Sequence, residues 1–170
     1  MVSQSGFFMR VSNLVVAAAL CVFSSACSKG GDKTQAPATA SAPVPTDAEK
    51  AALVAALPAP YNTGDIANGQ SRFALCRSCH TITEGGPDMT GPNLHGVFGR
   101  KIGTKPGYKY SAPVQAAGFI WDGDHLDKWL ADPRGFLPGT KMSFAGLKDP
   151  KDRIDLIAYL KVETGYKPAP

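Results

Sequence analysis

Two cysteines and a histidine stand together in the segment Cys76-Arg77-Ser78-Cys79-His80. Thiols three residues apart project toward the same side of a helical turn, so both can bond neighbouring vinyl groups of one porphyrin. The imidazole that follows directly is then placed to ligate the porphyrin iron. This spacing therefore predicts one covalently attached c-type haem, with Cys76 and Cys79 as attachment points and His80 as proximal ligand.

The same thiols could instead belong to a zinc site, a redox dithiol or a disulfide. A zinc site needs further Cys or His ligands, and outside the motif the chain has only Cys21, Cys27, His95 and His125. Cys21 and Cys27 lie in a segment with the pattern of an export signal. A thioredoxin-like dithiol would follow a strand in an alternating βα pattern, which this sequence lacks. Haem attachment is the interpretation that we prefer.

The motif is predicted to follow a helix. Asp65 can cap that helix, and its apolar side carries Ile66, Gly69, Phe73 and Cys76 at spacings of three, four and three. The helix would therefore lead directly into the cysteine motif.

Further helices are predicted after Ser111, Asp122 and Asp149, each of which can act as an N-cap. The first is a short turn ending near Gly118, and the second is halted by Pro133. The last runs from Asp149 to Gly165. It carries apolar residues at intervals of three, namely Ile154, Ile157 and Leu160. No period-two alternation indicates strands, so the predicted fold class is all-α.

Length and charge restrict the class of protein. The chain has 170 residues and a net charge of +4, and the part that reads as globular, 61–170, suits one small domain. No basic run alternates with aromatic residues, so nucleic acid is not an expected partner. We expect a monomer.

The N-terminus has the pattern of an export signal. Arg10 precedes the apolar run 14–23 and the small residues 24–26. Ten apolar residues are too few to span a membrane, which needs about 20. We therefore predict a signal peptide over 1–26 and an exported, periplasmic protein.

Cys27 follows a segment similar to a bacterial lipobox, although Ser24 stands where a leucine-like residue is usual. Lipidation of Cys27 would anchor the protein to a membrane. Two alternatives are cleavage after Ala26 without a lipid, and retention of the leader as an anchor. An exposed unpaired thiol in an oxidising compartment is a liability, which favours lipidation.

Residues 27–60 are predicted to be a flexible tether rich in Ala and Pro. A coil of about 30 residues spans roughly 30 Å, which would let an anchored domain reorient. A short helix over 48–57 is possible, but nothing obvious in the sequence holds it in place.

The second axial position of the iron separates a carrier from an enzyme. The candidate ligands are Met142, Met89, His95 and His125. Met142 lies in the turn-rich loop 138–142, which could present a thioether to the far side of the iron. We predict Met142 as the ligand, Met89 as a surface or packing residue, His95 as a hydrogen-bonded structural residue and His125 as a helix-surface residue.

Over roughly residues 64–164 the chain resembles the class I cytochrome c family, close to mitochondrial cytochrome c and bacterial cytochromes of the c2 type. Beside the haem motif, the resemblance rests on five segments: Thr90-Gly91-Pro92-Asn93-Leu94-His95-Gly96, Phe98-Gly99-Arg100-Lys101, Pro106-Gly107-Tyr108-Lys109-Tyr110, Pro138-Gly139-Thr140-Lys141-Met142 and Asp155-Leu156-Ile157-Ala158-Tyr159-Leu160.

The resemblance implies roles for residues around the haem. The Pro92 carbonyl would accept a hydrogen bond from His80, Thr140 would support the methionine side, and Gly69 and Tyr159 would mark the crossing of the first and last helices. The residues implied to hold the haem propionates are Arg100, Tyr110 and Trp121. Alternative interpretations are that Arg100 is a surface charge and Trp121 a core residue.

Two positions depart from the family pattern. Trp129 stands where relatives usually have tyrosine, near the ligating methionine, and Val114 stands where many have asparagine. These departures predict an altered polar network on that side of the haem.

An iron with both axial sites filled can pass one electron and has nowhere to bind a substrate. We therefore predict a carrier, not an enzyme, that shuttles electrons between membrane respiratory or photosynthetic complexes, from a bc1-type complex to a terminal oxidase. The alternatives are a small peroxidase and a haem subunit of a larger oxidoreductase. The resemblance places a set of basic residues near the haem edge, where they would steer docking to acidic partners: Arg72, Arg77, Lys101, Lys141, Lys148 and Lys151. The alternative is that these residues form an ordinary solvated surface.

Overall fold

The computed structural model describes residues 45–167, which belong to one compact unit. Its elements, in chain order, are α1 (Asp47–Ala55), the 3₁₀ helix η1 (Tyr61–Thr63), α2 (Ile66–Phe73), α3 (Ala112–Ala116), α4 (Gly123–Ala131), α5 (Pro133–Phe136) and α6 (Pro150–Glu163). Between residues 45 and 167 there is no strand, only an isolated bridge between Lys101 and Ile120. The predicted all-α class is confirmed.

The predicted signal peptide, Cys27 and residues 27–44 of the predicted tether lie outside the described residues. Among those that are described, no helix is long and apolar enough to cross a membrane.

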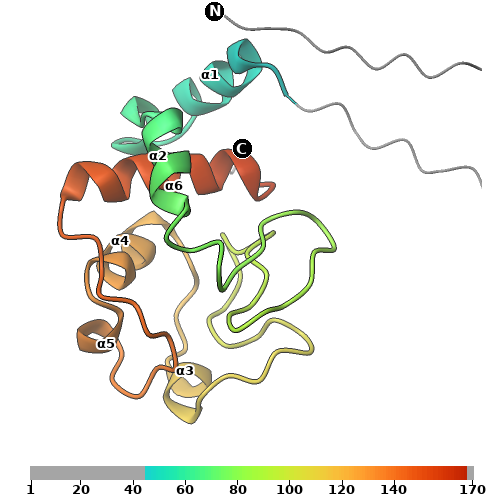
Figure 1. The fold of residues 1–170 in the computed structure, drawn as a ribbon, viewed down its shortest axis with the longest axis vertical. Coiled ribbons are helices and arrows are strands. Elements are labelled where there is room, and N and C mark those ends of the chain that lie inside the picture. The colour runs from blue at the N-terminus through green and yellow to red at the C-terminus, as the bar shows by residue number, and fades with distance from the viewer. Residues whose placement is uncertain (1–44, 168–170) are drawn as a thin grey trace, which may run out of the picture. The chain divides into compact units, whose positions relative to one another are not determined.

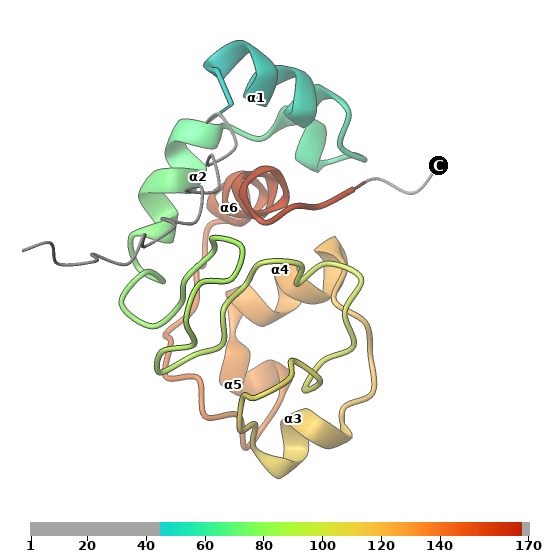
Figure 2. The same ribbon diagram turned by 90° about the vertical axis from the view of Figure 1, so that its right-hand side faces the viewer.

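Helix α6 is the central element of the fold. Asp149 caps it by accepting a hydrogen bond from the Lys151 N–H at 2.8 Å, Pro150 occupies its first turn, and Gly165 follows its end with a φ of 75°. Residues 155–161 of α6 are all buried. Figures 1 and 2 show α1 and α2 on one side of α6 and α4 and α5 on the other.

Helices α2 and α6 touch at the backbone. A Cβ at Gly69 would lie 2.2 Å from the Asp155 carbonyl oxygen and 2.6 Å from the Tyr159 Cβ. Only glycine allows this approach, as expected for the crossing of the first and last helices. The crossing fixes where α2 ends, and thus where the cysteine motif begins.

A buried carboxylate ties the start of α2 to α6. Asp155 accepts hydrogen bonds from the Asp65 N–H at 2.9 Å, Asn68 Nδ2 at 2.7 Å and Lys151 Nζ at 2.6 Å. Burial alone would raise the pKa of Asp155, but these donors together lower it. The carboxylate therefore remains charged and holds the N-terminus of α2 in place.

The predicted tether extends too far, because residues 47–55 form α1 and pack on the domain. Thr46 and Glu49 form a capping box, and Lys50 pairs with Glu163 at 2.6 Å. Val54 and Leu57 are each only 7% exposed. The folded domain thus begins no later than Thr46, rather than at the predicted Tyr61.

One other local expectation is confirmed and one needs correction. Pro133 does end α4, but it also opens α5, whose cap Asp132 accepts a hydrogen bond from the Gly135 N–H at 3.1 Å. Ser111 precedes α3 without a capping hydrogen bond from its side chain. The Ser111 hydroxyl therefore does not cap this helix.

Candidate functional site

A cavity with mainly apolar walls lies between α6, α4, α3 and the loops that connect α2 to α3 and α5 to α6. Each of the nine residues predicted for the site contributes to its lining: Cys76, Cys79, His80, Pro92, Arg100, Tyr110, Trp121, Thr140 and Met142. The fold therefore brings together residues that are up to 66 positions apart in the sequence.

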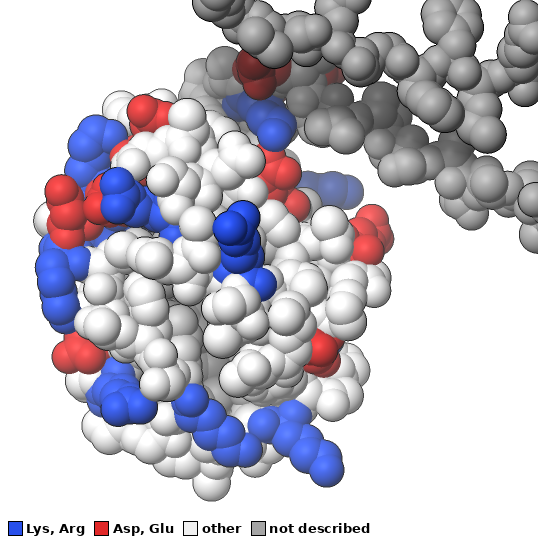
Figure 3. Space-filling view, viewed as in Figure 1, with Lys and Arg blue, Asp and Glu red and all other residues white. Residues whose placement is uncertain are grey.

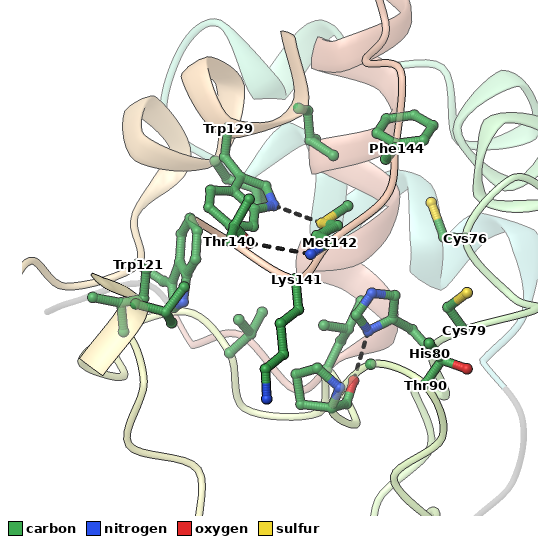
Figure 4. Close-up of a pocket in the computed structure, with 18 of the residues that line it drawn as sticks. Cys76, Cys79, His80, Thr90, Trp121, Trp129, Thr140, Lys141, Met142 and Phe144 are labelled. Atoms are coloured by element: carbon green, nitrogen blue, oxygen red, sulfur yellow. Dashed lines mark hydrogen bonds between the residues drawn. The ribbon is translucent and has the colours of Figure 1, made fainter. Parts of the chain in front are cut away.

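The cysteine motif forms a turn directly after α2. The N–H groups of Cys79 and His80 both donate to the Cys76 carbonyl at 2.9 Å. This turn directs both thiols toward one side of the cavity (Figure 4), and neither forms a disulfide. Burial, and to a smaller extent the neighbouring Cys79, raise the pKa of Cys76 to about 11.

The His80 ring is held by backbone groups. Its Nδ1 lies 2.7 Å from the Pro92 carbonyl oxygen, and because a carbonyl only accepts, Nδ1 carries the proton and Nε2 is left as the unprotonated nitrogen. Burial lowers the pKa of His80, although the hydrogen bond to Pro92 opposes that effect. A Cβ at Gly91 would lie 2.2 Å from His80 Cε1, so this position cannot carry a side chain.

Met142 reaches the cavity from the loop after α5. Its N–H donates to Thr140 Oγ1 at 3.2 Å, and the indole Nε1–H of Trp129 donates to its Sδ at 3.1 Å. Val114 is buried and lines the same cavity. The departure at Trp129 thus keeps a donor for the sulfur, whereas Val114 supplies none.

Polar groups at another part of the cavity have few protein partners. Within residues 45–167, the Arg100 guanidinium has no carboxylate within salt-bridge distance, and it donates only to the His95 carbonyl at 3.3 Å. Burial lowers the pKa of Arg100 and raises that of Tyr110. The Ser111 hydroxyl, also on the lining, is the one buried side-chain N or O atom of the described chain without a hydrogen bond. These groups are suited to an anionic acceptor.

Sequence reasoning missed two lining residues next to Tyr110. Ser111 was expected only as a helix cap, and its position directly after a predicted propionate contact was the available signal. Tyr108 donates through its hydroxyl to the Thr90 carbonyl at 2.6 Å and packs edge-on against Tyr110 at 4.7 Å between ring centroids.

The other candidate ligands lie outside the cavity lining. Met89 is 46% exposed. The His95 ring lies beside Gly165. The hydrogen bonds of His95 within the described residues are made by its backbone N–H and carbonyl, whereas we predicted that its imidazole would be hydrogen-bonded. His125 lies on α4 with a side chain that is 35% exposed, as predicted; its ring stacks on that of Phe119 at 4.5 Å between centroids, and its Nδ1 lies 2.8 Å from Asp122 Oδ1.

The residues present fit a haem c. Two thiols, an imidazole and a thioether reach one apolar cavity, and an unpaired guanidinium with an unpartnered hydroxyl could hold the carboxylates of a porphyrin. The fold and the site together define a small helical protein built around one covalent haem.

Comparisons with known proteins agree with this class. The cytochrome c family profile matches residues 66–162. The chain is 47% identical to cytochrome c of Sesamum indicum over 102 residues, which cover 59% of this chain and 92% of that protein. It is 50% identical to cytochrome c2 iso-2 of Magnetospirillum fulvum over 95 residues, which cover 56% and 98%. The structure of cytochrome cH from Methylobacterium extorquens matches with a TM-score of 0.54 and 45% identity, covering 58% of this chain and 98% of that one.

The chain belongs to the cytochrome c family. Members of this family bind one covalent haem c and transfer electrons.

Proposed function

We propose that this protein is a one-electron carrier whose haem iron is ligated by His80 and Met142. The observation that carries the proposal is that one imidazole and one thioether reach the same cavity, each oriented by hydrogen bonds from its surroundings. With both axial positions filled, no substrate can reach the iron, and the protein does not act as an enzyme.

Haem c, when bound, supplies a one-electron iron couple whose potential is raised by a thioether ligand and apolar surroundings. The chain's own residues hold and tune it. Pro92 fixes the tautomer of His80, and Trp129 and Thr140 hold Met142. Arg100, Tyr110, Trp121 and Ser111 would hold the two haem carboxylates.

Docking is proposed to use only part of the basic set expected from the sequence. Arg72 of α2 pairs with Asp152 of α6 at 3.1 Å, and Lys151 pairs with Asp155 within α6 at 2.6 Å, so both charges already have a carboxylate partner in the domain. Of the six residues, Lys141 alone lines the cavity. Figure 3 shows further Lys and Arg side chains along the lower edge of the domain as seen in that view. Positive charge around the cavity would steer encounters with acidic partners.

The carrier is proposed to work outside the cytoplasm, anchored to a membrane through lipid on Cys27. The partners proposed are membrane respiratory or photosynthetic complexes, with a bc1-type complex as donor and a terminal oxidase as acceptor. The sequence of the leader, Ser24-Ser25-Ala26-Cys27, supports the anchor. Mass spectrometry of protein extracted from membranes would detect a diacylglyceryl group on Cys27, and an unmodified soluble product would refute anchoring.

Axial ligation is tested by the sulfur-to-iron charge-transfer band of the oxidised protein. The band is expected in the wild type and in Met89→Ala, whose side chain is outside the cavity lining, and it should be absent in Met142→Ala. Loss of the band in Met89→Ala with retention in Met142→Ala would transfer the ligand role to Met89. Absence from the wild type would refute methionine ligation.

A further inference from the structure

The segment that carries Arg100, Tyr110 and Ser111 has little structure of its own. Residues 100–111, which we call the propionate loop, contain no helix, and the turn at Gly107 has a positive φ of 82°. A loop without secondary structure keeps one shape only where contacts with other parts of the domain hold it. The groups suited to the haem carboxylates therefore depend on whatever fixes this loop.

Lys105, in the middle of the propionate loop, pairs with Asp88 of the preceding loop. The Lys105 Nζ lies 2.8 Å from Asp88 Oδ1 and 3.0 Å from Asp88 Oδ2, and the two side chains are only 19% and 26% exposed. The same carboxylate accepts a hydrogen bond from the Asn93 N–H at 2.7 Å. The contacts with Lys105 and Asn93 lower the pKa of Asp88, so the carboxylate is charged at neutral pH.

Asp88 is a firm attachment point because its other partner, Asn93, is itself held in place. Asn93 is 4% exposed, and its Nδ2 donates to Thr81 Oγ1 at 2.6 Å. It directly follows Pro92, whose carbonyl orients the His80 ring. The ion pair thus ties the propionate loop to the backbone that holds the proximal histidine.

Lys105 also acts on Tyr110. Burial raises the pKa of the Tyr110 hydroxyl, while the Arg100 guanidinium and the backbone N–H of Lys105 oppose that rise. A second contact joins the same two loops, because the Tyr108 hydroxyl donates to the Thr90 carbonyl at 2.6 Å. A displacement of Lys105 would therefore move Tyr110 relative to Arg100.

We propose that Asp88 and Lys105 are a positioning pair, which holds the propionate loop in the shape that Arg100 and Tyr110 need to bind the haem carboxylates. This inference rests on the proposed function, which assigns the carboxylates to that loop. Neither member of the pair lines the cavity, so the pair acts through the groups that do. A loosened loop admits water, and solvent around the haem favours the oxidised, more highly charged iron. The ion pair therefore keeps the reduction potential high.

A direct effect of the two charges on the iron is the alternative, and it predicts opposite signs. Loss of the negative charge in Asp88→Asn would raise the potential, and loss of the positive charge in Lys105→Gln would lower it. Positioning predicts instead that both substitutions lower the potential, because each opens the same ion pair. The sign in Asp88→Asn therefore separates the two explanations.

Redox titration of the full-length haem-loaded chain measures this sign. In each single variant the equilibrium constant for reduction should fall at least threefold, which is about 28 mV for one electron. The double variant should fall no further than either single variant, and Lys105→Arg should match the wild type. Lys109→Gln, which removes a charge from an exposed position of the same loop, should change the constant less than about 1.5-fold. A higher or unchanged potential in Asp88→Asn would overturn the proposal.

Amide hydrogen exchange tests the loop independently of the potential. Amides of residues 105–110 should exchange at least tenfold faster in Asp88→Asn and Lys105→Gln than in the wild type, and at the wild-type rate in Lys109→Gln. Equal exchange in all of them would refute the positioning role. The sulfur-to-iron charge-transfer band reports the proposed function separately. Its absence from the wild type would refute methionine ligation, while exchange would still decide whether the ion pair holds the loop.

Discussion

Replacing Gly69 with alanine should loosen the crossing on which the haem motif depends. The new Cβ would lie 2.2 Å from the Asp155 carbonyl oxygen and 2.6 Å from the Tyr159 Cβ. Both neighbours are rigid parts of α6, so the helices must move apart. Overpacking costs about 1–3 kcal/mol, and two such contacts favour the upper end. Alanine regains up to ~1 kcal/mol in helix propensity, which leaves a net loss of about 2 kcal/mol.

Thermal unfolding of the haem-loaded protein, followed by circular dichroism, measures this loss. For a domain of this size, about 2 kcal/mol lowers Tm by roughly 6–12 °C. The matched control is Gln70→Ala, at the exposed neighbouring position of α2, which should change stability by less than ~0.5 kcal/mol. An unchanged Tm for Gly69→Ala would show that α2 can shift freely on α6, and would refute the argument that this contact fixes the motif.

Three further predictions concern buried or exposed charges. Asp155→Asn should cost about 1–3 kcal/mol at neutral pH. Because the folded-state pKa of Asp155 is lowered, its contribution to the free energy of unfolding is present above about pH 4 and is lost as the pH falls through the folded value. Urea unfolding at neutral and acidic pH should therefore show that the variant loses less stability in acid than the wild type. Burial lowers the pKa of Lys161 to about 8, so the unfolded chain binds more protons between that value and about 10.4, and wild-type stability relative to Lys161→Met should rise over that interval. Electron-transfer rates with an acidic redox partner should fall as ionic strength rises, and stopped-flow measurements should show a shallower dependence for Lys141→Gln than for Lys148→Gln, whose ammonium lies away from the cavity lining.

Cys76, Cys79 and His80 could be predicted from the sequence because their spacing has a chemical reason, whereas Pro92, Arg100, Tyr110, Trp121 and Thr140 were implied only by the resemblance to the cytochrome c family. Cys76 and His80 are close in sequence, so their joint role is a local feature. Met142 was predicted because a turn-rich loop can present its thioether to the iron. The caps Asp65, Asp122 and Asp149 were also predictable, because N-capping is a local interaction.

The features that sequence reasoning missed depend on distant partners. Helix α1 is held by Glu163, which is 113 residues from Lys50, and no local pattern shows that pairing. The unpartnered hydroxyl of Ser111 results from burial, which is a tertiary property. The helix after Pro133 was missed because proline, a reason to end α4, is equally suited to the first turn of a new helix.

Helix α6 joins the three parts of the domain because each of its sides has a different neighbour. Leu156 and Leu160 line the haem cavity, Asp155 and Tyr159 contact α2, and Glu163 pairs with α1. A helix with three occupied sides cannot shift toward one neighbour without losing contact with another. Hence the position of the cysteine motif after α2 and the attachment point of the preceding chain are both set relative to the same helix. The haem cavity and α1 are therefore held on different sides of one helix.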